Sequence, residues 1–413
     1  MYLLGTHIPI YVHGDRTYVE DSWFADIDLA RQYFAPHFGK LKVIGPSLPY
    51  PTSNSKSLQE VSANFDDLSL HPSIDARTRV RTFWPKAYRQ WKRDLAPLIT
   101  EATVVHASVD DPFQPMQLET IRAGIKEGKT TVLIGFDMDL WELLGIQLKK
   151  MNPYDAALHI FRTLGMDYWM RYCVKRASVS MLKEGLVFER YSGGAKNPKA
   201  FCHSMHSEKH IISENALDKR LAAVQSGRPL RLVYFGRLTK RKGITDAIRI
   251  VSGARKLGVN ASFDLIGEGE QQAELAQLVQ EIDATESIGF LGSFPYGDGL
   301  HLKLRKYDAL LFTPTEEDTP RMVYDAYASG LPLLTTDIAF LRHRKMQDNA
   351  SILFGIGNTG EGVSKLCELD SNRDLLVTLS KNARQAGVRH SVEQWYGKRL
   401  EWTLEAVESS SRN

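Results

Sequence analysis

Two basic and two acidic side chains in the second half of the chain have types and spacings suited to ligand binding, the basic pair to an anionic group. Arg237 and Lys242 belong to a loop that reads GRLTKRKG and directly follows an apolar run. Arginine and lysine supply positive charge, and the start of the helix that follows supplies free backbone amides. Glu317 and Asp325 lie eight residues apart, which lets both face one ligand. The alternative is that all four are solvated surface charges.

Each of these pairs follows a short apolar run that we expect to be a buried β-strand. The run 307–312 leads into the acidic turn 316–320 and then into a helical pattern over 321–329. The run 230–235 leads into the basic loop, and a second helical pattern follows it. Strands that alternate with helices indicate a parallel, doubly wound sheet, in which ligands bind beyond the carboxyl ends of the strands.

Two further junctions of this kind lie between the basic loop and the acidic turn. The apolar run FDLI is followed by GEGE, which contains Gly267 and Gly269, and the run IGFLG contains Phe290 and Leu291. Glycine lets the backbone approach a ligand closely, although a Gly-x-Gly pair alone is not specific. Together, the four junctions are expected to bring their loops to one edge of a C-terminal sheet.

The composition fits a globular protein with two domains of about 200 residues each. The chain has 413 residues, of which 43% are hydrophobic and 24% are charged. Its net charge is only +3, so the surface as a whole has no strong field of one sign. Its three cysteines are scattered, which indicates a reducing compartment without a disulfide framework. No metal-ligand spacing such as CxxC or HExxH occurs, so we expect no metal.

The N-terminal half shows the same alternation of strands and helices. We expect strands at 8–12, 41–44, 104–106 and 131–136, and helices at 28–38 and 117–127. His106 and Asp137 lie at or just beyond strand ends, where they either face a ligand or are ordinary polar groups of loops. Both are candidates for one side of a ligand site.

The stretch 77–93 carries seven basic residues, no acid and four aromatic residues. Such a pattern suits an anionic membrane surface, where each basic residue adds ~1 kcal/mol. The alternative is a solvated helix whose aromatic side chains turn inward. Because the chain is nearly neutral and has no nucleic-acid motif, we do not expect nucleic acid as a partner.

The second half resembles the retaining glycosyltransferases of the GT-B fold, especially glycosyltransferase family 4. Their acidic signature is Glu, seven residues, Glu, then Ala-x-Ala-x-Gly-x-Pro. Here Glu317 is followed by seven residues, Asp325 and AYASGLP. Asp replaces the second Glu, DTPR stands where the family has Phe-Gly, and the usual Gly-Gly loop is absent at 337–340. The loop GRLTKRKG is similar to the family motif Gly-Arg-Leu-x-x-x-Lys-Gly.

The resemblance implies an α/β fold of two Rossmann-like domains with a cleft between them and a C-terminal helix that crosses back. The expected bounds are 1–228 for an acceptor domain, 229–390 for a donor domain and 391–413 for the helix. Arg237 and Lys242, with Gly236, are expected to hold the donor diphosphate.

The remaining site residues follow from the same resemblance. Gly267 and Gly269 are expected to contact the nucleotide, and Phe290 and Leu291 its base. Glu317 is expected to hold donor-sugar hydroxyls, and Asp325 the ribose. His106 and Asp137 are the candidates for the acceptor or donor-sugar side. We take Glu317 to be catalytic, together with the two basic residues of the GRLTKRKG loop.

The implied reaction transfers a sugar, with retention of configuration and without metal or cofactor, from a UDP- or GDP-linked donor to a saccharide or lipid-linked acceptor. Such a protein is expected in the cytoplasm or at the inner face of the membrane. One alternative is another enzyme on this fold, an epimerase or a phosphorylase, although no lysine stands out for pyridoxal phosphate. The other is a degenerate protein that binds a nucleotide sugar without turnover.

Overall fold

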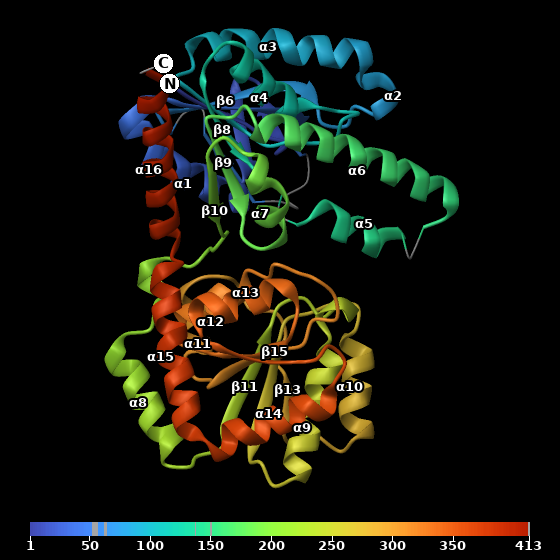
Figure 1. The fold of residues 1–413 in the computed structure, drawn as a ribbon, viewed down its shortest axis with the longest axis vertical. Coiled ribbons are helices and arrows are strands. Elements are labelled where there is room, and N and C mark those ends of the chain that lie inside the picture. The colour runs from blue at the N-terminus through green and yellow to red at the C-terminus, as the bar shows by residue number, and fades with distance from the viewer. Residues whose placement is uncertain (52–56, 62–63, 137, 149–150, 412–413) are drawn as a thin grey trace. The chain divides into compact units, whose positions relative to one another are not determined.

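The computed structural model describes residues 1–51, 57–61, 64–136, 138–148 and 151–411. The chain divides into two compact units (Figure 1). Unit 1 contains residues 1–201 and 396–413, and unit 2 contains residues 202–395. The predicted boundary at 228/229 falls inside unit 2, because the helix before it, α8 (Glu214–Gln225), packs on α15 (Arg373–Arg389) of that unit.

Unit 1 is built on a sheet whose main strand order is β10-β9-β8-β7-β1-β4-β2-β3-β5, with β6 paired to β4. The strands are β1 (Tyr2–Gly5), β2 (Ile10–His13), β3 (Arg16–Glu20), β4 (Leu41–Pro49), β5 (Leu58–Glu60), β6 (Leu68–Asp75), β7 (Val104–Ala107), β8 (Thr130–Ile134), β9 (Val179–Lys183) and β10 (Pro198–Phe201). Five of its pairings run from β10 through β4 in parallel, as expected from the alternating pattern.

The sheet of unit 1 is nevertheless mixed, which corrects the expectation of a parallel sheet. Strands β2 and β3 form an antiparallel hairpin, and β5 pairs antiparallel with β3. The hairpin turn contains Gly14, whose φ of +59° is in the region that glycine adopts most easily. A two-residue turn leaves no room for a crossover helix, so these strands cannot be parallel.

Helices cover the sheet of unit 1. They are α1 (Asp21–Phe38), α2 (Val80–Thr82), α3 (Tyr88–Glu101), α4 (Met116–Lys126), α5 (Leu140–Leu148), α6 (Pro153–Val174) and α7 (Leu186–Tyr191). The last helix, α16 (Val392–Ser411), returns to this unit from Tyr396 onward. The hydroxyl of Tyr396 donates to Oδ1 of Asp26 in α1 at 2.6 Å, and its ring lies 5.4 Å from that of Tyr33. The predicted return of the C-terminal helix is therefore confirmed.

Unit 2 is built on a six-stranded sheet in which every pairing is parallel. In spatial order its strands are β13 (Ile288–Phe290), β12 (Ala261–Ile266), β11 (Leu230–Phe235), β14 (Ala309–Phe312), β15 (Leu333–Thr336) and β16 (Ser351–Phe354). The remaining helices are α9 (Ile244–Lys256), α10 (Gln272–Glu281), α11 (Asp298–Leu304), α12 (Met322–Ala328), α13 (Ala339–Asp348) and α14 (Thr359–Ser371).

Burial on both faces explains why the strands of unit 2 are continuous apolar runs. All four residues of β14 and all four of β15 are buried. Helices α9 and α14 pack together, and α12 packs on α15 (Figure 1). Helix α9 buries the regularly spaced residues Ile244, Ala247, Ile248, Val251 and Ala254. The core of unit 2 thus fixes the strand ends from which the functional loops start.

Candidate functional site

The carboxyl ends of five parallel strands bring the predicted loops of unit 2 to one edge of its sheet. Strand β11 ends before Gly236, β12 before Gly267, and β14 before the acidic turn that contains Glu317. Strand β13 ends at Phe290, and β15 ends three residues before α13. Because all these strands point the same way, residues that are far apart in the sequence meet at this edge.

Backbone hydrogen bonds tie these loops to one another. The amide of Leu238 donates to the carbonyl of Glu268 at 2.9 Å, which joins the loop after β11 to the loop after β12. The hydroxyl of Thr313 donates to the carbonyl of Gly243 at 2.7 Å, and the amide of Thr315 donates to the carbonyl of Arg241 at 3.1 Å. The loops therefore form one continuous, preorganised surface.

Three glycines are required by this close packing. A Cβ atom on Gly267, whose φ is +144°, would lie 1.9 Å from the carbonyl oxygen of Gly236. A Cβ on Gly269 would lie 2.3 Å from the carbonyl oxygen of Leu238, and one on Gly243 would lie 1.7 Å from that of Thr313. Contact between neighbouring loops, and not only contact with a ligand, accounts for the glycine pattern of the sequence.

Arg237 and Lys242 lie on the loop between β11 and α9 but differ in their surroundings. The Arg237 side chain is exposed and, within the described residues, makes no hydrogen bond or ion pair. No side chain caps the N-terminus of α9, so the helix start keeps its positive character. An exposed guanidinium beside such a loop can bind an anion directly.

Lys242 is buried and already has a partner. Its Nζ lies 2.5 Å from Oδ2 of Asp318, and Nη1 of Arg241 lies 3.0 Å from the same oxygen. Nζ also lies 5.3 Å from the ring centroid of Phe312. Burial lowers the pKa of Lys242, while the carboxylate of Asp318 opposes this shift. The carboxylate of Asp318 thus favours the charged form of the lysine that it faces.

Glu317 binds the start of α13. Its Oε2 accepts a hydrogen bond from the amide of Ala339 at 2.9 Å, and its Oε1 accepts one from the amide of Phe340 at 2.8 Å. A carboxylate at a helix N-terminus satisfies amides that otherwise have no partner in the helix. The pair of bonds fixes the carboxylate plane.

Asp325 is buried in α12, and its carboxylate accepts a hydrogen bond at 3.1 Å from the hydroxyl of Tyr296. Nε2 of His301 lies 3.7 Å from the same oxygen. Burial raises the pKa of Asp325 to about 7, an effect that the Tyr296 hydrogen bond and the charge of Arg321 oppose. This carboxyl group therefore changes its charge near neutral pH.

The residues predicted to contact a base lie at the end of β13. The Leu291 side chain is exposed, and its amide donates to the carbonyl of Leu265 at 2.9 Å. Phe290 is partly buried and is paired with Leu265 in the sheet. The Leu291 amide is therefore committed to the sheet, and its exposed side chain is the part that stays available for contact.

Of the two candidate site residues in unit 1, His106 and Asp137, the structure describes only His106. His106 lies within β7, is buried, and has its Nδ1 2.6 Å from the hydroxyl of Tyr2. Complete burial lowers its pKa well below the ordinary value. The structure thus places His106 in the core and not at an open strand end, since it contacts Tyr2, whose ring stacks on that of Phe34 in α1. Asp137 lies outside the described residues.

In the stretch 77–93, two of the aromatic side chains are buried, whereas the basic side chains of α3 are exposed. Phe83 and Trp91 are buried, as the alternative of a solvated helix requires, whereas Trp84 is 45% exposed. The indole nitrogen of Trp84 donates to the carbonyl of Phe113 at 3.0 Å, which joins the stretch to the loop before α4.

Asp318 and Tyr296 belong to the site but are missing from the predicted set. Asp318 stands in the segment that departs from the family signature, and this departure was the signal that could have found it. Tyr296 lies between β13 and α11 and has no motif to mark it. Among the described residues, no group of three histidine, cysteine or acidic side chains is placed to hold a metal ion.

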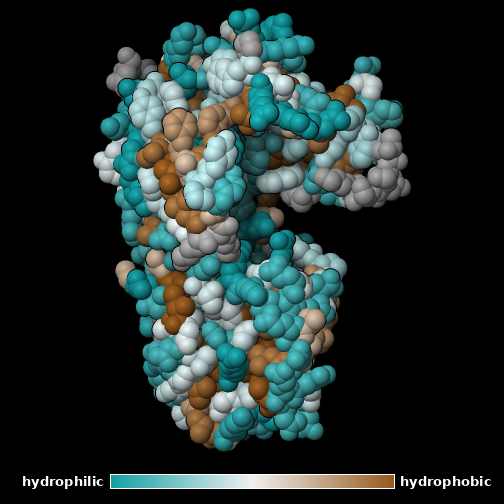
Figure 2. All heavy atoms as spheres, turned by 90° about the vertical axis from the view of Figure 1, so that its right-hand side faces the viewer, coloured by the Kyte–Doolittle hydropathy of each residue, from teal (hydrophilic) through white to brown (hydrophobic). Residues whose placement is uncertain are grey.

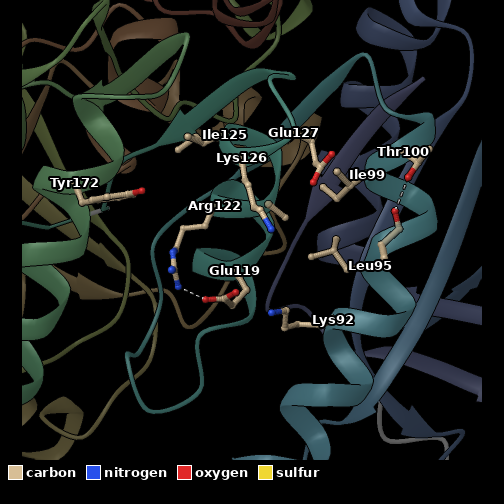
Figure 3. Close-up of a pocket in the computed structure, with 12 residues that line it drawn as sticks. Lys92, Leu95, Ile99, Thr100, Glu119, Arg122, Ile125, Lys126, Glu127 and Tyr172 are labelled. Atoms are coloured by element: carbon tan, nitrogen blue, oxygen red, sulfur yellow. Dashed lines mark hydrogen bonds and ion pairs between the residues drawn. The ribbon is translucent and has the colours of Figure 1, made fainter.

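A cavity of about 640 Å³ lies between α3 and α4 of unit 1 (Figure 3). Its lining contains the bases Lys92, Arg122 and Lys126 and the acids Glu119 and Glu127. Arg122 points toward Glu119 and forms an ion pair with it. Because its charges nearly cancel, this cavity offers no concentrated field for an anionic ligand, and it includes none of the predicted site residues.

Residues 219–386 match the family model for glycosyl transferases group 1. The chain is 26% identical over 145 residues to 2-deoxystreptamine glucosyltransferase of Streptomyces kanamyceticus, a match that covers 35% of this chain and 37% of the relative. It is 30% identical over 113 residues to glycogen synthase of Mycobacterium tuberculosis, which covers 27% of each chain. The matched segments therefore span about two fifths of the first relative and about a quarter of the second.

Solved structures resemble the whole chain. WaaG, a glycosyltransferase involved in lipopolysaccharide biosynthesis, has a TM-score of 0.61 and 13% identity, with 97% of this chain and 99% of that chain covered. HepE of Anabaena, solved in complex with UDP, has a TM-score of 0.61 and 14% identity, with 98% and 100% covered. At these identities the likeness shows the fold, and the predicted GT-B architecture is confirmed.

Proposed function

Residues 219–386 match the model of the glycosyl transferases group 1 family, and from this premise we propose that the protein transfers a sugar from a nucleoside diphosphate sugar to an acceptor. The proposal includes retention of configuration at the transferred sugar and no requirement for metal. The donor is UDP- or GDP-linked, and the acceptor is a saccharide or a lipid-linked saccharide. HepE, which shares the fold, binds UDP according to its structure.

The observation that carries the proposal is the anion site at the β11–α9 junction. Arg237 is exposed, Lys242 and Arg241 point at a common negative oxygen, and no side chain caps the N-terminus of α9. A diphosphate has the charge and the size to satisfy such a group. Its position at the carboxyl edge of a parallel sheet is where nucleotides bind in open α/β folds.

The chemistry of the reaction needs stabilisation of a departing diphosphate. The bond between the anomeric carbon and the phosphate oxygen breaks, and negative charge develops on that oxygen. Arg237 and Lys242 are fixed cations that neutralise this charge without reorganisation. Losing one such donor costs ~3 kcal/mol in the barrier, which is about a hundredfold in rate. These side chains supply the charge that a metal supplies in other transferases.

The two carboxylates complete the donor site in this proposal. Glu317, held by the amides of Ala339 and Phe340, accepts hydrogen bonds from hydroxyl groups of the donor sugar. Asp325 accepts hydrogen bonds from the ribose hydroxyls when the hydroxyl of Tyr296 gives way. Glu317 is fixed by protein donors before the ligand arrives, which lowers the cost of binding.

An anionic membrane surface is the proposed source of a lipid-linked acceptor. In unit 1, the exposed side of α6 carries Tyr154, Phe161, Leu164 and Tyr168. The ring of Phe161 lies 6.0 Å from that of Phe113, which accepts the Trp84 hydrogen bond, so these aromatics adjoin the basic stretch 77–93. On the face turned to the viewer, Figure 2 shows brown, apolar side chains of unit 1 among teal, polar ones.

No described helix has both the length and the apolar character to cross a bilayer. The proposal therefore concerns contact with the membrane surface, at its inner face in the cytoplasm. Basic side chains approach lipid phosphates while aromatic rings enter the headgroup region. Alpha-monoglucosyldiacylglycerol synthase of Acholeplasma laidlawii, 26% identical over 171 residues, which is 41% of this chain and 42% of that relative, is named for a lipid product.

A thermal-shift panel followed by a turnover assay tests the proposed function. Purified protein is heated with UDP, GDP, ADP, dTDP and CMP and with their sugars. A ligand at a hundred times its dissociation constant stabilises the fold by ~2.7 kcal/mol. We expect a shift with one diphosphate that Arg237→Ala removes. Lys240→Ala, which removes an exposed basic residue of the same loop, is the matched control.

The outcomes separate the proposed function from its alternatives. Release of the nucleoside diphosphate only when an acceptor is present supports transfer. Conversion of the donor sugar without any acceptor indicates an epimerase. Binding without turnover indicates a degenerate nucleotide-sugar-binding protein. No shift with any nucleotide at millimolar concentration contradicts the donor site.

A further inference from the structure

One acidic residue stands inside the cationic loop where the donor phosphates are expected. Oδ2 of Asp318 lies 2.5 Å from Nζ of Lys242 and 3.0 Å from Nη1 of Arg241. Its other oxygen, Oδ1, accepts a hydrogen bond from the amide of Thr319 at 2.9 Å. Asp318 and Lys242 are 8% and 9% exposed. One negative charge is therefore held, largely out of water, between two positive ones.

We infer that Asp318 is an internal counter-anion that occupies the phosphate position of the donor site until a nucleotide displaces it. The inference rests on the proposed function, since it assigns the same loop to the donor diphosphate. An oxygen of the Asp318 carboxylate takes the place of a phosphate oxygen, because both accept charge-assisted hydrogen bonds from lysine and arginine. Asp318 is in this way a residue that determines donor affinity and specificity.

Binding then becomes an exchange of anions and not a simple addition. Arg241, Lys242 and Asp318 carry a combined charge of +1, whereas the two basic residues alone would carry +2. In a largely buried site the attraction between close charges is much stronger than in water. A ligand must supply enough negative charge to replace the carboxylate, and the carboxylate must move to solvent. A nucleoside without phosphate gains nothing from this exchange.

The arrangement also has a consequence for the empty site. Two adjacent cations without an anion repel each other, and burial of an unpaired charge is costly. Asp318 removes both problems, which keeps the β11–α9 loop folded when no nucleotide is bound. The expected cost is weaker binding of every phosphate ligand than the two cations alone would give. Selectivity for a diphosphate over a ligand with less charge is the expected gain.

Asp318→Asn is the variant that tests the inference. Asparagine keeps an oxygen for the Thr319 amide and the size of the side chain but removes the charge. Binding is measured by titration calorimetry at fixed ionic strength with the diphosphate found in the thermal-shift panel, with inorganic pyrophosphate and with the matching nucleoside. We expect about tenfold or greater tightening for the two phosphate ligands and no change for the nucleoside.

Asp374→Asn is the matched control, because it removes a surface acid from the same unit. Asp374 accepts a hydrogen bond from Gln225 at 2.8 Å and follows Arg373, whose side chain contacts the carbonyl of Arg228 just before β11. It therefore lies near the amino end of the sheet, away from the loops. Asp318→Ser, which also keeps an oxygen, repeats the test if the asparagine variant has a lowered melting temperature.

A double-mutant cycle with Lys242→Met completes the design. If Asp318 acts through Lys242, its neutralisation improves phosphate binding much less in the Lys242→Met background. Unchanged or weaker binding by Asp318→Asn, while the unaltered protein binds the diphosphate, overturns the inference, because Asp318 then only positions Lys242. Phosphate binding that appears only in the Asp318 variants supports it. If no form of the protein binds any phosphate ligand, the proposed function fails and this inference with it.

Discussion

The hydroxyl of Tyr296 donates a hydrogen bond to the buried carboxylate of Asp325 across 3.1 Å. Burial raises the pKa of Asp325 from an ordinary 3.8 to about 7. Between these two values the folded protein keeps a proton that the unfolded chain has lost. Stability therefore falls as the pH rises through this window and levels off above about pH 7. The hydroxyl of Tyr296 occupies the position at Asp325 where a ribose hydroxyl is expected to bind.

Asp325→Asn should remove this part of the pH dependence. We expect the variant to gain stability over the unaltered protein between pH 5 and pH 8, by on the order of 2 kcal/mol. Urea unfolding at the two pH values measures the difference. Tyr296→Phe removes a hydrogen bond that favours the ionised carboxyl group, so it should be most destabilising at pH 8. A difference between Asp325→Asn and the unaltered protein that stays constant with pH would show that Asp325 is ionised throughout.

A second prediction concerns the two bonds from Glu317 to the start of α13. Glu317→Ala leaves the amides of Ala339 and Phe340 without these acceptors, so we expect a loss of about 1 kcal/mol in unfolding free energy. Glu317→Gln keeps one acceptor oxygen and should lose less. Chemical denaturation measures both values.

Transfer activity then separates the two roles of Glu317. If the carboxylate also holds sugar hydroxyls, Glu317→Gln should lower turnover far more than it lowers stability. Asp337→Asn is a suitable control, because Asp337 lies nearby but forms a half-exposed pair with Arg342. Equal activity of Glu317→Gln and this control would leave Glu317 with a purely structural role.

Local patterns were sufficient to predict the elements of unit 2 and the edge where its loops meet. The apolar runs 230–235 and 307–312 correspond to β11 and β14 with small shifts at the ends. A parallel sheet then brings their carboxyl ends together without any knowledge of distant contacts. For this reason the positions of Arg237, Lys242 and Glu317 at one edge could be predicted from the sequence.

The partners of these residues could not be predicted in the same way. Lys242 and Asp318 are 76 residues apart, and Tyr296 and Asp325 are 29 apart, so each pairing depends on how the loops pack. The position of His106 near a strand end does not show which way its side chain points, so its burial could not be predicted. The β2–β3 hairpin could not be predicted from the apolar run 8–12 alone, because its partner strand is short.

A third prediction concerns Gly267, where the loop after β12 touches the loop after β11. A Cβ there would meet the carbonyl oxygen of Gly236 at 1.9 Å with φ at +144°. Gly267→Ala should therefore cost more than about 2 kcal/mol, because both overlap and backbone strain oppose it. Gly258→Ala is the matched control, since Gly258 has φ of +95° but no atom within 4 Å of a Cβ. Equal losses would show that the loops separate easily.

The last prediction concerns the aromatic side chains of α6 and the basic stretch 77–93. We expect the protein to sediment with vesicles that contain phosphatidylglycerol, and much less with neutral phosphatidylcholine vesicles, because each basic residue contributes ~1 kcal/mol at an anionic surface. Phe161 and Tyr168 are each 62% exposed on α6, so the double change Phe161→Ser and Tyr168→Ser should release the protein without unfolding it. Leu257→Ser, at a leucine in unit 2 that is 71% exposed, should have no effect. Equal sedimentation with both vesicle types, or retention of the double variant, would favour a solvated helix face instead.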